Sequence, residues 1–245
     1  MIKKVLPATI VIIANVPDEG VLKARLQADL ASSDCTRLAA AFLRDTVDAA
    51  RQTASHVMVA YSAENGEADL AALLPADVQL IPQSEADFGE RVIHAVAVAL
   101  KKYPGPVIAI GTDSPTMPLN EVRRAIDTLF ADPAQLVLGP TPDGGVWLIG
   151  THYPLSRALF DGVVWETPTV FKDIVANTRC LAVYLTTVRE WYDVGTVDDL
   201  RRLAGELQLA KQGEPKTTET WRWIVDNVEA LRPAYAASGG GRRQS

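Results

Sequence analysis

Asp113 directly follows a short apolar run in the sequence Val107-Ile108-Ala109-Ile110-Gly111-Thr112-Asp113. Such a run is typical of a strand that is buried on both faces. Ligands of open α/β sheets bind beyond the carboxyl ends of the strands, so the Asp113 carboxylate could hold a divalent cation against a phosphate group. The alternative is an aspartate that only caps a turn between a strand and a helix.

Three cations are further candidates for binding phosphate. The loop after the first apolar run contains Gly20, Lys23 and Arg25. Glycine lets a phosphate approach the backbone and the two cations would neutralise it, so this loop could bind a diphosphate. Lys23 and Arg25 could equally be ordinary surface cations. Arg91 lies in the first turn of an expected helix, where its charge opposes the helix dipole, and this favours a functional or ion-pair role.

An alternation of strands and helices is needed to bring these residues together. Apolar runs predict strands at residues 9–13, 57–61, 78–82, 107–110, 135–140, 146–150 and 180–185. Helical spacing predicts helices after Ser33 or Asp34, within 62–75, from 83, after 118, after 165–168, from 197 and around Trp221. The turn at 141–145 is short enough for a hairpin, which would place an antiparallel strand in a mainly parallel sheet. We therefore expect an α/β layer fold.

The composition is that of an ordinary globular protein and excludes several kinds of partner. A chain of 245 residues with 48% hydrophobic residues can bury a core without disulfides. A net charge of -6 without a long basic run argues against a nucleic-acid partner. Cys35, Cys180 and the three histidines lack metal-site spacing, and no apolar stretch is long enough for a membrane span. We expect a cytoplasmic protein.

The ordered set of motifs, over roughly residues 8–205, resembles the DUF2064 family of bacterial GT-A-like proteins. That family is related to glycosyltransferases and to nucleotidyltransferases of the molybdenum-cofactor and phospholactate guanylyltransferase types. The matching motifs contain Gly20, Lys23, Ala24 and Arg25; Gly89, Glu90 and Arg91; Asp113, Ser114 and Pro115; Asp143, Gly144 and Gly145; Trp165 and Thr167; and Asp193, Val194, Gly195 and Thr196. The resemblance implies a three-layer, Rossmann-like GT-A (nucleotide-diphospho-sugar transferase) fold with a mixed, mainly parallel central sheet.

The resemblance also implies roles for these residues. Asp113 and Asp193 would hold Mg²⁺ or Mn²⁺. Asp113 and Asp143 would be the catalytic residues, with Asp143 facing the acceptor and acting as the base if the reaction is an inverting glycosyl transfer. The nucleotide and its phosphates would be bound by Ala14, Asn15, Gly20, Lys23, Arg25, Gly89 and Arg91, with further backbone contacts from 14–16 and 82–84. The acceptor would contact Gly144, Gly145, Trp165 and Thr167.

Structural roles are the alternatives for several of these residues. Asp143 could only build its turn, and Asp193 could cap the helix expected from Val197. Arg91 could pair with Glu90 or Asp87, and Trp165 could belong to the core.

Three functions are open. The leading hypothesis is a metal-dependent transferase that uses a nucleotide sugar on a small-molecule acceptor. The first alternative is nucleotidyl transfer to a phosphorylated small molecule. The second is a nucleotide-binding or partner-binding protein without catalysis, because the chain departs from the family pattern at Asn15, Glu19, Ala24, Val146-Trp147 and Gly195. There the family has a basic residue, a proline, a threonine, a tyrosine pair and an acid.

The chain is expected to contain one large domain and two short additions. Residues 1–210 would form the transferase-like domain, and 211–236 an amphipathic helix that docks on it or on a second subunit. Residues 237–245 would form a flexible tail. A homodimer is therefore one expectation for the assembly.

Overall fold

A mixed sheet forms the centre of the molecule. The computed structural model describes residues 6–17, 24–62, 66–84, 86–210, 218–228 and 231. The sheet order is β3-β2-β1-β4-β6-β5-β7. The strands are β1 (Leu6–Ala14), β2 (Ala54–Tyr61), β3 (Gln79–Pro82), β4 (Val107–Ile110), β5 (Gln135–Pro140), β6 (Val146–Thr151) and β7 (Tyr184–Thr187). Strand β6 is antiparallel to β4 and β5, and the other pairs are parallel. The predicted mixed, mainly parallel sheet is confirmed.

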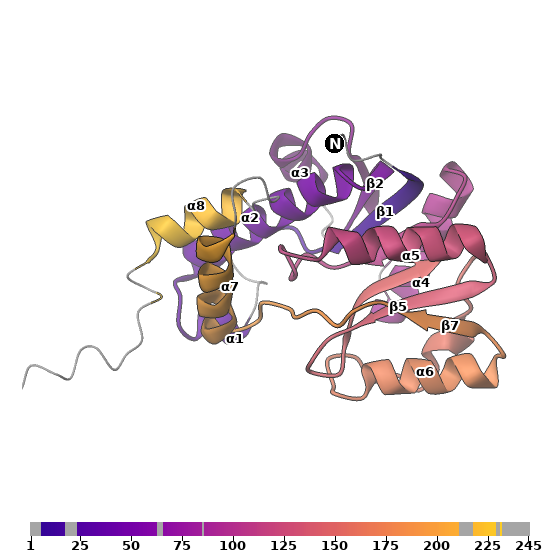
Figure 1. The fold of residues 1–245 in the computed structure, drawn as a ribbon. Helices are drawn as coiled ribbons and strands as arrows, with labels where there is room; N and C mark the ends of the chain where they lie inside the picture. The colour runs from indigo at the N-terminus through magenta and orange to yellow at the C-terminus, as the bar shows by residue number, and fades with distance from the viewer. Residues whose placement is uncertain are drawn as a thin grey trace, which may run out of the picture.

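Helices cover both faces of this sheet. They are α1 (Ala24–Gln27), α2 (Ser32–Arg51), α3 (Glu67–Leu73), α4 (Phe88–Lys102), α5 (Leu119–Ala131), the 3-10 helix η1 (Arg157–Phe160), α6 (Val170–Cys180), α7 (Val197–Leu209) and α8 (Thr218–Asp226). Helices α2, α3 and α5 contribute to the core on one face, and α4, η1 and α6 to the core on the other. Figure 1 shows α5 and α6 on opposite sides of the strands, which is the three-layer arrangement expected from the sequence.

The central strands β1 and β4 are mainly apolar because both of their faces are buried. In β1, Ile10 and Ile12 face the α2–α5 core, whereas Val11 and Ile13 face the α4–α6 core. Strand β4 divides its four residues between the two cores in the same way. This alternation with period two is what a central parallel strand requires.

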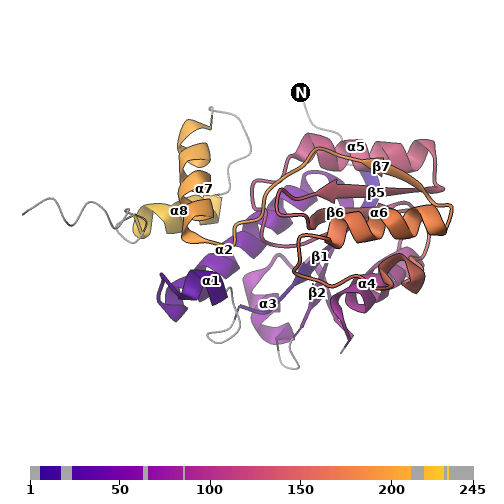
Figure 2. The same ribbon diagram turned by 90° about the horizontal axis from the view of Figure 1, so that it is seen from below.

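A helical bundle lies beside the sheet and forms a third core. Helices α1, α7 and α8 pack around the amino-terminal half of α2, away from the strands (Figure 2). Phe42 of α2, Leu200 of α7 and Ile224 of α8 meet in this core. The C-terminal helix therefore docks on its own domain. No helix in the described ranges combines the length and apolar character needed to cross a bilayer.

Local expectations differ from the structure at three helix boundaries. Helix α4 begins at Phe88, after Asp87 as its cap, and not at residue 83 as predicted. Helix α2 begins after Ala31, and no side chain caps it, so the predicted Ser33 or Asp34 cap is wrong. The last strand begins at Tyr184, because Cys180 still ends α6 and Ala182 turns the chain with a φ of 54°. Apolar runs alone do not distinguish the end of a helix from the start of a strand. Neither Cys35 nor Cys180 forms a disulfide.

A buried carboxylate holds α8 in place. Asp45 of α2 is 4% exposed and accepts hydrogen bonds from the backbone N–H groups of Glu219 (3.1 Å) and Thr220 (2.7 Å). These N–H groups belong to the first turn of α8, where a helix has donors without partners of its own. Burial raises the pKa of the Asp45 carboxyl above its ordinary value of 3.8, and the hydrogen bonds from α8 offset only part of that effect.

The Asp45→Asn variant should therefore change how stability depends on pH. A raised pKa means that the folded state binds a proton at Asp45 more tightly than the unfolded state. The contribution of Asp45 to stability then falls as the pH rises from 3.8 through the raised pKa. We expect the free energy of unfolding of the unmodified protein, minus that of Asp45→Asn, to increase as the pH is lowered from 7 towards 4.

Urea unfolding of both proteins across this pH range measures the difference. Asp48→Asn, at an exposed site on the same helix, controls for the loss of one negative charge. A difference that stays constant or shrinks on acidification would contradict this account.

Candidate functional site

Several of the motifs predicted from the sequence, all within the described residues, meet at one edge of the sheet. Strands β1 and β4 are parallel neighbours and end there, at Ala14 and Ile110. The turn at 141–145 reaches the same edge because β6 is antiparallel to β4, with Leu148 opposite Ile110. The start of α4, which carries Gly89 and Arg91, follows the end of β3. These are the carboxyl ends at which open α/β sheets bind ligands.

Residues 188–195, called the strap below, cross this edge between β7 and α7. Backbone hydrogen bonds attach the strap to three places: Val188 N–H donates to Leu138 O (2.9 Å), Trp191 N–H to Pro140 O (3.1 Å), and Val194 N–H to Asp113 O (2.7 Å). The last bond makes Asp193 a neighbour of Asp113, although 80 positions separate the two in sequence.

Ser114 connects the two aspartates through its side chain. Its hydroxyl donates to Asp193 Oδ1 at 2.6 Å and lies 3.0 Å from the backbone oxygen of Tyr192. Both Asp113 and Asp193 are half-buried. The alternative role of Asp193 as a helix cap is wrong, because Thr196 caps α7 in a capping box with Asp199. The Asp193 carboxylate is thus oriented by a hydroxyl group of the loop that carries Asp113.

The residues on either side of Asp193 are anchored in the helical bundle. Tyr192 and Val194 are buried in the core formed by α1, α2, α7 and α8. The Tyr192 hydroxyl donates to Glu206 Oε2 at 2.7 Å, and the Arg202 guanidinium lies 3.6 Å from the centre of its ring. Burial, with the hydrogen bond to Glu206, raises the pKa of the Tyr192 phenol far above its usual range. This phenol therefore stays protonated and serves as an anchor.

Gly195, where the family pattern has an acid, lies inside the cap of α7. Its N–H donates to Asp199 Oδ2 at 3.1 Å, and a Cβ at this position would be 4.0 Å from the same oxygen. A carboxylate at position 195 would repel the Asp199 carboxylate, which makes the capping box. In this structure Gly195 therefore belongs to the cap of α7.

Gln83 joins the ends of three strands next to the predicted nucleotide-binding backbone. Its Nε2 donates to Ala14 O (2.9 Å) and Ala60 O (2.7 Å), and its Oε1 accepts from Arg91 Nη1 (3.1 Å). Ser62 Oγ donates to Asn15 Oδ1 nearby, at 2.9 Å. The segments around residues 14–16 and 82–84, both predicted to contact the base and ribose, therefore lie side by side.

Arg91 points towards this strand edge and does not form the ion pairs considered as its alternative role. Its guanidinium bonds to Gln83 and lies 5.4 Å from the centre of the Phe88 ring. Glu90 and Asp87 pair with Arg157 of η1. The start of α4 therefore presents one cation to the edge while its acids are directed to η1.

Gly89 and Trp165 have packing roles in the described structure. The Trp165 ring stands edge-on to Phe88, with centroids 4.8 Å apart, and lies 5.4 Å from Phe160. A Cβ at Gly89 would be 3.1 Å from Phe160, so glycine allows η1 to approach α4 closely. Thr167 donates to Val164 O at 2.6 Å, inside its own loop. Their predicted contacts with phosphate or acceptor stay predictions.

Asp143 builds the turn between β5 and β6. It is exposed, and its Oδ1 accepts from the Thr141 hydroxyl (2.5 Å) and from Gly145 N–H (3.3 Å). Gly144 has a φ of 89°, and its carbonyl accepts from Phe171 N–H at 2.8 Å. The turn is thereby joined to the segment after Trp165, so the predicted acceptor residues come from two adjoining loops.

The cations of the first loop lie outside this description. Gly20 and Lys23 are not among the described residues, and for Arg25 only the backbone in α1 is described. The described residues contain no group of three or more His, Cys, Asp or Glu side chains that could hold a metal ion. Two carboxylates are nevertheless a suitable donor set for Mg²⁺ or Mn²⁺, since such ions are commonly held by one or two carboxylates together with substrate phosphates.

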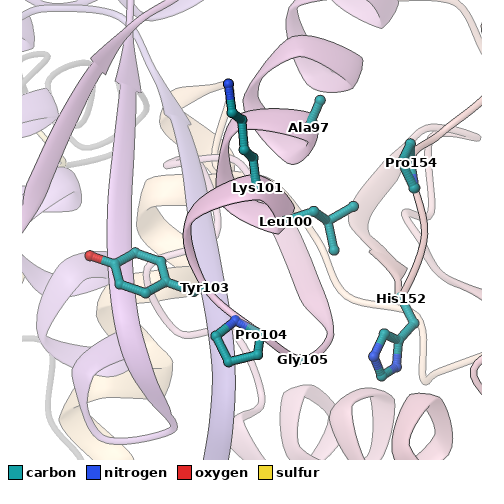
Figure 3. A pocket seen from close by; sticks show the side chains of 8 residues that line it. All are labelled: Ala97, Leu100, Lys101, Tyr103, Pro104, Gly105, His152 and Pro154. Atoms are coloured by element: carbon teal, nitrogen blue, oxygen red, sulfur yellow. The ribbon is translucent and has the colours of Figure 1, made fainter.

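A shallow cavity of about 410 Å³ lies at the opposite edge of the sheet. It is lined by residues that precede β4 or follow β6, including Leu100, Pro104 and His152 (Figure 3). The side chains of Lys101 and Tyr103 extend away from the space between Leu100 and His152. This cavity contains none of the residues predicted from the motifs.

Residues 46–167 match the model of the family described as "Uncharacterized protein conserved in bacteria (DUF2064)". The predicted family resemblance is confirmed. The fold is similar to that of a protein from Desulfovibrio desulfuricans G20 that is provisionally assigned as a nucleotide-diphospho-sugar transferase. That comparison has a TM-score of 0.81 and 24% sequence identity, and covers 92% of this chain and 96% of the other.

A second similar structure is the 4-diphosphocytidyl-2C-methyl-D-erythritol synthase of Anaerococcus prevotii DSM 20548, with a TM-score of 0.52 and 13% identity over 81% of this chain and 98% of the other. A cytidylyltransferase of Leptospira borgpetersenii has a TM-score of 0.50 and 13% identity over 92% and 97%. At these identities the likeness to nucleotide-diphospho-sugar transferase-like and nucleotidyltransferase structures establishes the GT-A-like fold alone. The comparison with curated protein sequences gives no match.

Gly144→Ala should destabilise the protein much more than the same change at Gly162. A Cβ at Gly144 would lie 2.1 Å from Pro168 O, in a residue with positive φ, whereas Gly162 has a φ of 72° and a Cβ added there would have no other atom within 4 Å. We expect losses of about 2–5 kcal/mol for Gly144→Ala and about 1–2 kcal/mol for Gly162→Ala. Urea denaturation measures both, and equal losses would show that the contact between the two loops is absent.

Proposed function

We propose that this protein is a metal-assisted transferase that binds a nucleotide donor at the carboxyl edge of its sheet. The observation that supports this most directly is the pairing of Asp113 with Asp193 through the strap, with Ser114 oriented on the Asp193 carboxylate. Two adjacent carboxylates at this edge can share one divalent cation with a diphosphate. When bound, such a cation neutralises the charge that develops on the departing phosphate groups.

The chain's own residues would divide the remaining tasks. Ser114 holds Asp193 in one orientation, and Arg91, tied to Gln83, supplies a positive charge beside the ends of β1 and β2. Lys23 and Arg25 would contact the phosphates from the first loop, as the family resemblance implies. The backbone near Asn15 and Ser84 would contact the base and ribose.

Nucleotidyl transfer requires less of Asp143 than inverting glycosyl transfer does. In glycosyl transfer, an acceptor hydroxyl bonds to the anomeric carbon, the nucleoside diphosphate leaves, and a base must take the hydroxyl proton. Asp143 is the proposed base, yet its Oδ1 already accepts two hydrogen bonds inside its turn. In nucleotidyl transfer, a phosphate oxygen of the acceptor attacks the α-phosphorus and pyrophosphate leaves. That oxygen is already ionised, so no base is required.

Similar structures include both classes, since the Desulfovibrio desulfuricans protein carries a nucleotide-sugar assignment and the Leptospira borgpetersenii protein is a cytidylyltransferase. Product analysis separates the two reactions. We expect pyrophosphate release from a nucleoside triphosphate with a sugar phosphate, and no nucleoside diphosphate release from nucleotide sugars with neutral sugars. Release of the diphosphate alone would instead assign glycosyl transfer.

Binding of metal and nucleotide together is the second expected property. A nucleotide at 100 times its dissociation constant adds about 2.7 kcal/mol to stability, which is roughly 5–10 °C in Tm for a domain of this size. We expect such a shift with a nucleotide plus Mn²⁺, and little with Mn²⁺ alone, because the protein itself contributes only two carboxylates.

Asp113→Asn and Asp193→Asn should each remove the shift, whereas Asp127→Asn, at an exposed site on α5, should retain it. A metal-dependent shift that survives Asp113→Asn would refute the assigned site. Binding that depends on Asp113 but is accompanied by no turnover with any donor would favour the non-catalytic alternative.

A further inference from the structure

Side chains from two elements hold both polar backbone groups of one strap residue. The Arg189 N–H donates to Glu121 Oε2 of α5 at 3.0 Å, and the Arg189 carbonyl accepts from Trp147 Nε1 of β6 at 3.2 Å. Glu121 is 8% exposed and Trp147 is 4% exposed. Hydrogen bonds in such surroundings are costly to break, because the partner left behind cannot bond to water. The strap is therefore clamped four residues before Asp193.

The neighbouring strand is shaped to accept the Trp147 indole. Gly139 of β5 lies beneath the ring, and a Cβ there would be 2.5 Å from Trp147 Nε1 and 2.6 Å from Cε2. The ring also belongs to the same core as Val188 and Trp191 of the strap. Gly139 thus leaves the space that the indole ring occupies, and the indole N–H, the only hydrogen-bond donor of that side chain, bonds to the strap backbone.

We propose that Trp147 is a positioning residue that fixes the strap and thereby keeps Asp193 beside Asp113 for binding a metal–nucleotide complex. This inference rests on the proposed function for its ligand. It gives a role to Trp147, which replaces one residue of the tyrosine pair that the family resemblance implies. Trp147 acts through the Arg189 carbonyl and contacts neither metal nor nucleotide. Groups that orient metal ligands from outside the coordination sphere commonly change metal affinity by about 10-fold to 100-fold when altered.

Trp147→Phe removes the N–H donor and keeps an aromatic ring in the core. Hydrogen exchange of a peptide spanning the strap measures the first expected effect, which is faster exchange at 188–195 without any ligand. Titration of Mn²⁺ in the presence of GTP, CTP or UTP, followed by the electron paramagnetic resonance signal of free Mn²⁺, measures the second. We expect roughly tenfold weaker Mn²⁺ binding with the nucleotide that the unmodified protein prefers.

Two further variants separate positioning from general loss of stability. Tyr103→Phe likewise removes one hydrogen-bond donor and keeps an aromatic ring, because it deletes the bond from the Tyr103 hydroxyl to Gln79 Oε1 (3.1 Å), at the opposite edge of the sheet from the strap. This variant should lower Tm while leaving the hydrogen exchange of the strap and the affinity for Mn²⁺ unchanged. Gly139→Ala should displace the indole and reproduce both effects of Trp147→Phe while the tryptophan itself is retained.

The possible results distinguish failure of this inference from failure of the proposed function. If the hydrogen exchange of the strap or the affinity for Mn²⁺ is unchanged in Trp147→Phe, the positioning role is overturned. An equal effect of Tyr103→Phe would overturn it as well, since the effect would then follow stability alone. If the unmodified protein binds no Mn²⁺ with any of the three nucleotides, the proposed function fails. Independently of that result, unaltered hydrogen exchange of the strap in Trp147→Phe would show that Trp147 does not fix the strap.

Discussion

The hydrogen bond from the Val194 amide to the Asp113 carbonyl is the contact on which the candidate site depends. At 2.7 Å it fixes the strap against the loop after β4 and brings together two aspartates that are distant in sequence. The loop is positioned by a strand that is buried on both faces. The strap is positioned at one end by β7, which pairs with β5, and at the other by Tyr192 and Val194 in the helical bundle. Sheet and bundle are thus both required to define the position of one carboxylate relative to the other.

This arrangement connects the bundle to the proposed chemistry. Helix α8 is held by the Asp45 carboxylate and packs on α2, and α2 and α7 enclose the residues on either side of Asp193. Helix α1, which directly follows the first loop, buries Leu26 in the same core. The terminal helix therefore supports the region that adjoins both the strap and the first loop, although it is far from the sheet.

The sequence predicts those features of the fold that repeat with a period. All seven strands and the main helices follow from apolar spacing, and the antiparallel β6 follows from the short turn at 141–145. The family resemblance adds Asp113 and Asp193 as a pair, and the strap makes them neighbours. Boundaries such as Cys180 were less predictable because an apolar run continues from α6 into β7.

The supporting residues of the site could not be inferred in this way. Ser114, Glu121, Trp147 and Asp45 act through one or two hydrogen bonds each to partners that are 42 to 175 positions away. Such contacts leave no periodic signal, and a buried Glu121 looks like any other charge on a helix until its partner is known. Trp147 and Gly195 appeared only as departures from a family pattern. In the structure each has a local role, one as a donor to the strap and the other within the cap of α7.

The central claim is that Asp113 and Asp193 together hold a divalent cation on a bound nucleotide. A crystal of the protein with Mn²⁺ and a non-hydrolysable nucleoside triphosphate, measured at an X-ray energy where manganese scatters anomalously, tests this directly. The account predicts one strong anomalous peak within about 2–2.5 Å of a carboxylate oxygen from each aspartate and of a phosphate oxygen. A bound nucleotide with its manganese peak elsewhere, or with neither aspartate as a ligand, would contradict it.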